Sequence, residues 1–146
     1  MSKLIRKPLA VLIMVFGLLV TLAAGAALAA QVICPTGGGS CYGTSGNDFI
    51  TGTNFADDIY GYAGNDTIHP GKGSDWVFPS TGDDRIVLPL GSGGKDHVSG
   101  WDGDDYIDIW DLDHYDTVFC GSGTDTVHAD TPDSIRNDCE NVIKHP

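Results

Sequence analysis

The sequence has little positive charge and almost no glutamate. Of its 146 residues only 8 are Lys or Arg, against 20 acidic residues, and the formal net charge is −12. Such an acidic chain is not expected to bind nucleic acid or anionic lipid, and it is expected to attract cations. Nineteen of the acidic residues are Asp, and only Glu140 is Glu. The short Asp side chain suits turns and turn-bound metals, so this bias indicates a geometric demand rather than solubility alone.

The sequence also lacks any motif that places a nucleophile beside a general base. Its histidines fall at varying positions of the repeat described below, as solvent-facing residues do. We therefore expect no catalytic residues and no enzymatic activity.

The N-terminal residues have the order of a secretory signal peptide. A basic start, Lys3 to Lys7, precedes an apolar run over residues 9–24, and Ala27-Leu28-Ala29 offers a cleavage site. A membrane anchor is the alternative, because about 20 apolar residues can span a bilayer. We expect residues 1–29 to be removed and the protein to be secreted, with membrane contact only if the segment stays uncleaved. Cleavage removes three of the eight basic residues and no acidic one, which brings the net charge to −15.

Four cysteines in an exported chain predict disulfides. Three pairings are possible, but two cysteines lie near the start of the exported part and two near its end. This layout favours Cys34–Cys41 and Cys120–Cys139. A zinc site is the alternative, and the sequence has no C-x-x-C pair to support it.

An internal repeat of nine residues covers most of the chain after residue 42. Five units follow without a gap from residue 43 to residue 87, and four more follow, with insertions at 88–90 and 109–110. Each unit has Asp at its sixth position and Ile or Val at its eighth. The units begin at residues 43, 52, 61, 70, 79, 91, 100, 111 and 120. Such self-similarity is the signature of a repeat architecture.

Each unit is expected to form a turn followed by a short strand. The first six residues are rich in Gly, Asn, Ser and Asp, which favour turns. The last three form a strand whose eighth side chain points inward between two outward ones. One such strand buries too little alone, but stacked units bury a continuous double row of Ile and Val. We therefore expect an all-β fold with a thin aliphatic core.

The units "GTSGNDFIT" and "GYAGNDTIH" and their neighbours resemble the repeats-in-toxin, or haemolysin-type calcium-binding, family, whose repeat is G-G-x-G-x-D-x-U-x. The likeness covers residues 43–128, although few units have the double glycine. It implies a right-handed parallel β-roll, that is, a β-solenoid with two units per coil. It also implies several calcium ions between the coils, bound by backbone carbonyls of the turns and by the Asp of each unit.

The resemblance assigns calcium to nine aspartates in two columns, because alternate units lie on opposite sides of the roll. The first column is Asp48, Asp66, Asp84, Asp105 and Asp125, and the second is Asp57, Asp75, Asp96 and Asp116. Every unit of the first column has Gly at its fourth position, whereas Phe55 and His114 stand there in the second. We therefore expect a continuous ladder in the first column and a patchier one in the second. A single Asp more often caps its own turn, which is the alternative for any one unit.

Stacked carboxylates repel one another, so the fold is expected to require calcium, and calcium binding is the expected function. A second function rests on outward-facing aromatic residues: Tyr60, Trp76 and Phe78 would lie together, with Phe119 further along. An exposed aromatic patch suggests an extracellular adhesion or envelope-associated module with a protein or cell-surface partner, or self-association. Coverage by the C-terminal segment or by residues 88–90 is the alternative.

These interpretations divide the chain into four parts. Residues 1–29 form the signal peptide and residues 30–42 an N-terminal segment with Cys34 and Cys41. Residues 43–128 form the calcium-binding roll, and residues 129–146 a C-terminal capping segment.

Overall fold

The computed structural model describes residues 12–15, 18–21, 28–112 and 115–146. Every element of these residues is a β-strand, and none of them forms a helix that could span a membrane. The predicted signal peptide, residues 1–29, lies mostly outside the described residues. Within it, β1 (Leu12–Val15) and β2 (Leu18–Thr21) form an antiparallel pair.

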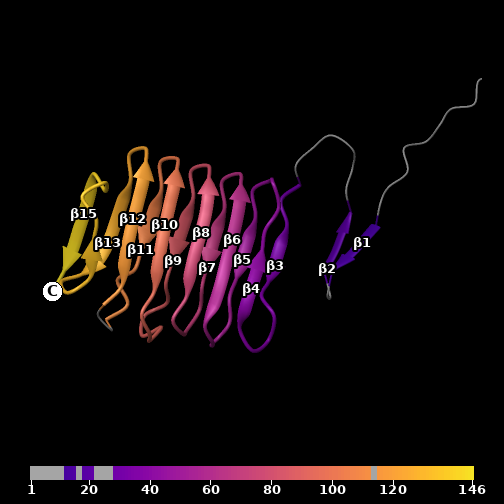
Figure 1. The fold of residues 1–146 in the computed structure, drawn as a ribbon, viewed down its shortest axis with the longest axis horizontal. Coiled ribbons are helices and arrows are strands. Elements are labelled where there is room, and N and C mark those ends of the chain that lie inside the picture. The colour runs from indigo at the N-terminus through magenta and orange to yellow at the C-terminus, as the bar shows by residue number, and fades with distance from the viewer. Residues whose placement is uncertain (1–11, 16–17, 22–27, 113–114) are drawn as a thin grey trace, which may run out of the picture.

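The remaining strands wind into a parallel β-roll, in which successive strands alternate between two sheets (Figure 1). The six-stranded sheet contains β4 (Gly39–Tyr42), β6 (Asp57–Ala63), β8 (Trp76–Thr81), β10 (His97–Asp102), β12 (Thr117–Ser122) and β14 (Ser134–Ile135). The seven-stranded sheet contains β3 (Gln31–Ile33), β5 (Phe49–Thr51), β7 (Thr67–His69), β9 (Arg85–Val87), β11 (Tyr106–Asp108), β13 (Thr126–Asp130) and β15 (Asn141–His145). The prediction of an all-β parallel roll is confirmed.

Two aliphatic rows fill the space between the sheets. In the seven-stranded sheet, Ile50 pairs in register with Ile68, and Ile68 with Ile86. In the six-stranded sheet, Ile59 is in register with Val77. Every eighth-position side chain of the nine units is at most 1 % exposed. Each such burial contributes about 1.5–3 kcal/mol, and the core contains little besides these rows.

The roll extends beyond the nine repeats at both ends. Strand β3 pairs with β5 and β4 pairs with β6, although residues 31–42 contain no repeat motif. At the other end β14 pairs with β12, and β15 pairs with β13. The two flanking segments therefore each add strands to both sheets.

The structure shifts the two insertions by one residue relative to the sequence interpretation. Leu88 and Ile109 are buried, and their N–H groups bond to carbonyls of the next coil, as the first residue of a regular unit does. Both residues are therefore core residues at a first position. The extra residues lie after them, in lengthened turns that end at Asp96 and Asp116.

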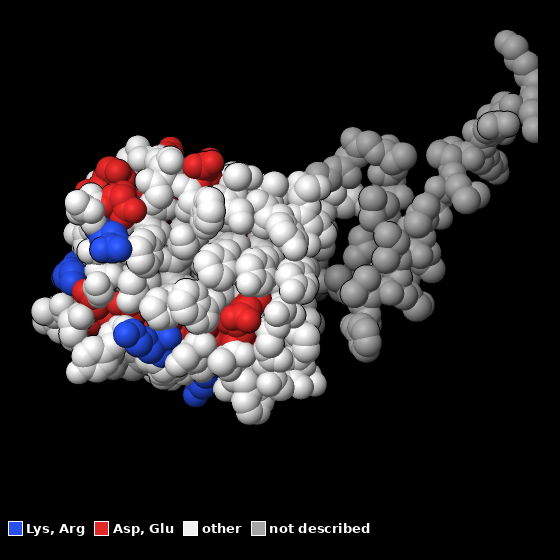
Figure 2. Space-filling model, viewed as in Figure 1, with Lys and Arg blue, Asp and Glu red and all other residues white. Residues whose placement is uncertain are grey.

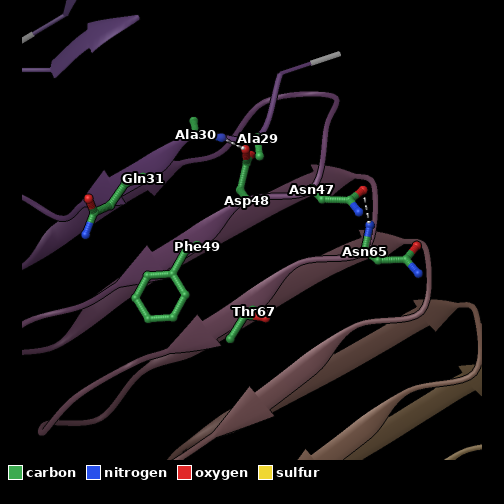
Figure 3. Close-up of a pocket in the computed structure, with 8 residues that line it drawn as sticks. All are labelled: Ala29, Ala30, Gln31, Asn47, Asp48, Phe49, Asn65 and Thr67. Atoms are coloured by element: carbon green, nitrogen blue, oxygen red, sulfur yellow. Dashed lines mark hydrogen bonds between the residues drawn. The ribbon is translucent and has the colours of Figure 1, made fainter. Parts of the chain in front are cut away.

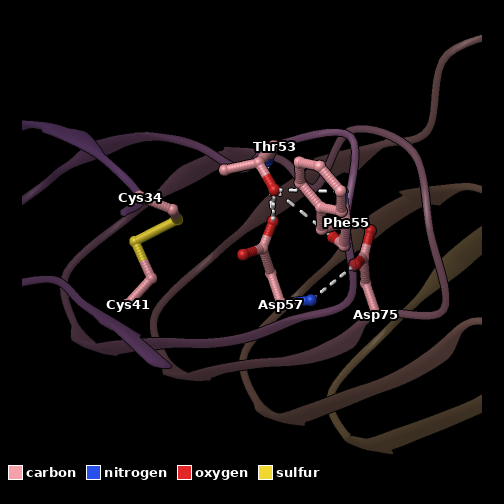
Figure 4. Close-up of a disulfide and its surroundings, with 6 residues drawn as sticks. All are labelled: Cys34, Cys41, Thr53, Phe55, Asp57 and Asp75. Carbon is pink, nitrogen blue, oxygen red and sulfur yellow. Dashed lines mark hydrogen bonds between the residues drawn. A yellow bond between two sulfur atoms is a disulfide. The ribbon is translucent and has the colours of Figure 1, made fainter. Parts of the chain in front are cut away.

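Disulfides lie at both ends of the roll. Cys34 is joined to Cys41 and Cys120 to Cys139, the pairs that the spacing favours, with 5.2 Å between Cα atoms in each. The first bond crosses the interior of the first coil beside Asp57 (Figure 4). The second ties the last repeat to the C-terminal segment, so each bond fixes a coil that has a neighbour on one side only.

Candidate metal centre

Each repeat aspartate lies at the end of a turn, directly before its strand, and the turns of neighbouring coils pack very closely. At the fourth position, Gly82 and Gly103 have φ of +132° and +140°. A Cβ on Gly103 would lie 1.9 Å from the carbonyl oxygen of Gly82. Glycine is required there because the next turn leaves no room for a side chain and because few other residues adopt this φ.

All nine predicted aspartates are buried. None exposes more than 3 % of its surface. Few acidic side chains therefore show on the face in Figure 2, although the chain is strongly acidic. A buried carboxylate is costly unless hydrogen bonds or a cation satisfy it, so the partners of each oxygen decide what these groups can do.

In the first column, one oxygen of each carboxylate is satisfied by the backbone of the preceding coil. The N–H of each Asp donates to Oδ1 of the equivalent Asp one coil later. The N–Oδ1 distances are 2.8 Å for Asp48–Asp66, 2.7 Å for Asp66–Asp84, 2.9 Å for Asp84–Asp105 and 2.9 Å for Asp105–Asp125. This first aspartate ladder of hydrogen bonds is continuous, and a continuous row of calcium ions beside it stays a prediction.

The second column forms the same ladder. The corresponding distances are 2.9 Å for Asp57–Asp75, 2.7 Å for Asp75–Asp96 and 2.8 Å for Asp96–Asp116. The patchier calcium ladder expected in the second column stays a prediction, and no gap is present in these hydrogen bonds. These hydrogen bonds use the backbone N–H of the sixth residue, which every unit has whether or not its fourth residue is Gly. The unit with Phe55 at its fourth position therefore forms the bond as well. His114, the other substitution, lies outside the described residues.

The second oxygen of most ladder carboxylates has no hydrogen-bond partner in the described part of the chain. These buried oxygens are Oδ1 of Asp57 and Oδ2 of Asp66, Asp75, Asp84, Asp105, Asp116 and Asp125. Since nearly all buried polar atoms in proteins are satisfied, a repeated exception in register marks these oxygens as candidate ligand atoms.

The chemical type of the groups around these oxygens suits a cation. A Cβ on Gly61 would lie 2.3 Å from Asp66 Oδ2, and a Cβ on Gly100 would lie 2.3 Å from Asp105 Oδ2. Glycine at the first position therefore leaves open the space that the oxygen faces. The donors are carboxylates, with backbone carbonyls close by, and calcium takes six to eight oxygens of these types.

Comparison with known proteins identifies the repeats. The family model of the RTX calcium-binding nonapeptide repeat matches four copies, over residues 42–77 and 90–108. These units are RTX calcium-binding repeats. No curated protein and no solved structure matched the chain.

Burial and mutual repulsion make the RTX carboxylates hard to ionise. Loss of hydration raises the pKa of Asp66 to about 6 and that of Asp75, Asp84 and Asp105 to about 7. The ladder hydrogen bond that each carboxylate accepts opposes part of this rise in pKa. The pKa of Asp116 is raised to about 8, first by burial and further by the charges of Asp96, Asp111 and Asp133. Without a cation, these carboxylates are therefore harder to ionise than an exposed aspartate.

Two acidic residues outside the repeats end the ladders. Glu140 Oε2 accepts the N–H of Asp125 at 2.9 Å, and Asp133 Oδ1 accepts the N–H of Asp116 at 3.1 Å. Neither role could be predicted from the repeat motif. Glu140 is the only glutamate in the chain, which is the one signal that sets it apart, and neither residue lies in a recognisable repeat.

The first aspartate of each ladder differs from the rest. Both oxygens of Asp48 accept hydrogen bonds, Oδ1 from the N–H of Ala30 at 2.7 Å (Figure 3) and Oδ2 from the N–H of Thr44. Asp57 Oδ2 likewise accepts from the N–H and Oγ1 of Thr53, at 2.7 and 3.0 Å (Figure 4). These two residues cap their own turns, so the interior aspartates are the stronger metal candidates.

An exposed row of hydrogen bonds runs alongside the first aspartate ladder. Its direction is opposite, because each N–H donates to a side chain of the preceding coil. The N–H of Asn65 donates to Asn47 Oδ1 at 2.9 Å (Figure 3), and the N–H of Asp104 donates to Asp83 Oδ1 at 3.0 Å. These fifth-position residues hold the turns together from the solvent side. The sequence analysis did not use them.

The predicted aromatic patch is present and larger than expected. We define the aromatic strip as Tyr42, Tyr60, Phe78, Trp76 and His97 on the six-stranded sheet. Ring centroids are 5.4 Å apart for Tyr42–Tyr60, 5.2 Å for Tyr60–Phe78 and 4.2 Å for Trp76–His97. Tyr42 and Trp76 are 55 % and 47 % exposed, so neither the C-terminal segment nor residues 88–90 covers them.

Proposed function

We propose that this protein is a secreted calcium-binding protein whose roll folds together with its calcium ions. The observation that carries the proposal is the row of buried carboxylate oxygens that have no hydrogen-bond partner among the described residues, most of them in register within the two ladders. Bound calcium would neutralise these carboxylates and take their oxygens as ligands. Asp66, Asp84 and Asp105 in the first ladder and Asp75 and Asp116 in the second are the residues best placed to hold it.

Repulsion within the ladders is large enough to control folding. Parallel coils lie about 4.8 Å apart, and two ionised carboxylates at that distance repel by about 0.8 kcal/mol even in water. Over the seven neighbouring pairs of the two ladders this amounts to about 6 kcal/mol, within the range of about 5–15 kcal/mol for the whole stability of a small domain. We infer that the ionised roll is unstable without a divalent cation.

The extracellular location is supported by the disulfides and by the leader-like N-terminus. Disulfides persist outside the cytosol. Extracellular calcium sites commonly have Kd values of about 10⁻⁴–10⁻³ M. Such affinities would leave the chain loosely folded in the cell and folded after export.

That the protein is not an enzyme stays a prediction.

Metal removal tests this function. The full chain is heated in excess chelator, in about 5 mM calcium and in about 5 mM magnesium, and unfolding is followed by circular dichroism. With calcium we expect the midpoint to rise by well over 10 °C relative to chelator, and with magnesium much less, because Mg²⁺ requires a tighter octahedral site. Equal midpoints in calcium and chelator would contradict the proposal, and an equal effect of magnesium would indicate charge screening instead.

A second candidate function is supported by the aromatic strip. Beside it, Trp76, Phe78, His97, Ser99 and Phe119 line a cavity of about 200 Å³, where Ser99 leaves a gap in the row of rings. At its rim the guanidinium of Arg136 lies 4.6 Å from the ring centroid of Phe119. Since the chain is strongly acidic, two copies repel one another. We propose a basic polypeptide partner whose Arg side chains stack on the strip.

Alanine substitution of Trp76 tests this second function. We expect Trp76→Ala to weaken binding of an Arg-rich peptide about tenfold, as for an aromatic hot spot, with calcium-induced folding retained. Trp101→Ala is the control, because Trp101 is exposed but lies outside the strip. Equal peptide binding by both variants and the original chain would contradict the proposal, as would strip-dependent dimerisation without peptide binding.

A further inference from the structure

One group of carboxylates in the roll is not explained by the repeat. Asp96, Asp111 and Asp116 are all buried, and each offers a carboxylate oxygen within 4.8 Å of the others. Asp96 and Asp116 are consecutive members of the second ladder. Asp111 is not at a sixth position and belongs to no ladder, so its place beside them needs a separate cause.

The lengthened turn supplies Asp111. In a regular unit the ladder aspartate comes five residues after the first position, but here Ile109 is the first-position residue and Asp116 the ladder residue. The two extra residues let the turn carry an additional carboxylate inward, where Asp111 is 0 % exposed. One coil earlier, in the other lengthened turn, Ser92 is also buried, and its hydroxyl donates to Asp111 Oδ2. Ser92 thereby orients this carboxylate.

A second observation points to a ligand at this place. Asp116 is fully buried, and its Oδ2 has no hydrogen-bond partner among the described residues, while its Oδ1 accepts the N–H of Asp96 at 2.8 Å. One coil further on, Asp130 is 1 % exposed and its Oδ1 is likewise without a partner in the described part of the chain. Asp130 is linked to the same turn, because its Oδ2 accepts the N–H of Leu112 at 2.8 Å.

Lys144, a basic residue of the C-terminal segment, makes its hydrogen bonds elsewhere. The ammonium of Lys144 donates to the backbone carbonyls of Asp133 and Thr131, at 2.8 and 3.2 Å. Asp133 uses its carboxylate for backbone N–H groups, including those of Tyr115 and Asp130. Among the residues that the structure describes, Oδ2 of Asp116 therefore has no hydrogen-bond donor, and a positive group would satisfy it.

We propose that Asp96, Asp111 and Asp116 form an additional cation site, built by the insertion and distinct from the repeat sites in having a carboxylate from outside the repeat motif. The donors are oxygens only, which selects a hard cation. Calcium accepts six to eight oxygens in flexible geometry, so three carboxylate oxygens that all lie within 4.8 Å of one another suit it, and backbone carbonyls or water would complete the set. The inference rests on the proposed function in that Asp96 and Asp116 also belong to the second ladder.

Calcium titration calorimetry on the full chain and three variants tests the site. Asp111→Asn keeps the shape of the side chain and removes its charge. Asp102→Asn removes one charge from an exposed residue and is the matched control, and Asp66→Asn alters only the first ladder. We expect Asp111→Asn to bind one calcium ion fewer than both the original chain and the control Asp102→Asn. We expect Asp66→Asn to retain the ion that Asp111→Asn loses. Equal numbers and affinities for Asp111→Asn and Asp102→Asn would overturn the inference.

The variants separate this inference from the proposed function. Loss of ions in Asp66→Asn with none lost in Asp111→Asn would support the ladders and overturn the additional site. A chain that binds one ion only, lost in Asp111→Asn and kept in Asp66→Asn, would support the additional site and overturn the ladders. No calcium binding by the original chain would overturn both.

Diffraction from the original chain keeps the test valid if Asp111→Asn does not fold. In crystals grown with calcium, we expect an anomalous peak within about 2.6 Å of a carboxylate oxygen of Asp96, Asp111 and Asp116. Peaks along the ladders with none at this place would overturn the inference.

Discussion

At the residue scale, the two oxygens of an interior aspartate such as Asp84 have different surroundings, and in the proposed function one builds the roll while the other binds a cation. In Asp84, Oδ1 accepts the N–H of Asp66, and Oδ2 has no hydrogen-bond partner among the described residues. Structure and binding are therefore separated within one side chain. An amide at this position can still accept the ladder hydrogen bond, but it offers a cation no negative charge.

Asp84→Asn should weaken calcium binding without destroying the fold. We expect an apparent calcium affinity about tenfold lower, because affinity in such sites depends on ligand charge. In chelator the variant should be at least as stable as the original chain, since one repelling charge is gone. Calcium titration and urea unfolding measure the two effects. Asp102→Asn is the control, and an affinity equal to that of the control would contradict the assignment.

Gly103→Ala should destabilise the roll through the close contact of its turns. The new methyl group would meet the carbonyl of Gly82 at 1.9 Å, and the φ of +140° adds backbone strain. We expect a loss of about 3 kcal/mol or more in the free energy of unfolding in calcium. Gly37→Ala is a matched control, because Gly37 has φ of +129° and nothing lies within 4 Å of its added Cβ. A similar loss in both variants would show that strain alone is responsible.

Much of this residue-scale picture is predictable from the sequence. The period of nine predicted the aspartates of both ladders and the buried aliphatic rows, since every unit repeats the same environment. Glu140 and Asp133 could not be predicted as ladder ends, because they follow a segment without repeat spacing and only the folded backbone brings them into register. Asp111 was missed for a related reason: a lengthened turn, not the motif, moves it inward.

At the scale of elements, the ends of the roll need support that the middle does not. An interior strand has a parallel neighbour on each side, whereas β15 pairs only with β13. The sequence predicted disulfides near both ends from the cysteine layout. It did not predict strands β3, β4, β14 and β15, because a segment that pairs with only one neighbouring coil can do so without the full motif.

Removal of the C-terminal disulfide should loosen β15 first. Closing the loop of 19 residues between Cys120 and Cys139 stabilises the fold by about 3 kcal/mol in the chain-entropy estimate. In the double variant Cys120→Ser, Cys139→Ser, we expect the amides of Asn141–His145 to lose hydrogen-exchange protection while β7 and β9 keep theirs in calcium. The variant Cys34→Ser, Cys41→Ser should affect β3 and β4 instead. Unchanged exchange in β15 would contradict the role of this bond.

At the scale of the whole molecule, acidity and fold are coupled through the buried carboxylates. Four ladder carboxylates have pKa values raised to about 6 or 7, and Asp116 to about 8, from an unfolded value of 3.8. A group whose pKa is raised by folding contributes stability at low pH and loses it as the pH rises through the folded value. The metal-free roll should therefore lose stability between about pH 5 and pH 8.

Calcium should reverse this pH dependence. In chelator we expect the free energy of unfolding, measured with urea, to fall from pH 5 to pH 8, by up to about 1.4 kcal/mol per pH unit for each group that titrates. In calcium the apparent affinity should rise over the same interval, because protons no longer compete for the carboxylates. A metal-free chain that becomes more stable from pH 5 to pH 8 would contradict the account.

The central claim is that calcium and the folded roll form together. The most direct measurement is a calcium titration of the full chain at pH 7.5, followed by far-ultraviolet circular dichroism and reversed with chelator. We predict a weak β signal without calcium, a cooperative gain as calcium rises toward about 1 mM, and its loss on chelation. A full β signal in excess chelator that calcium does not change would contradict the claim.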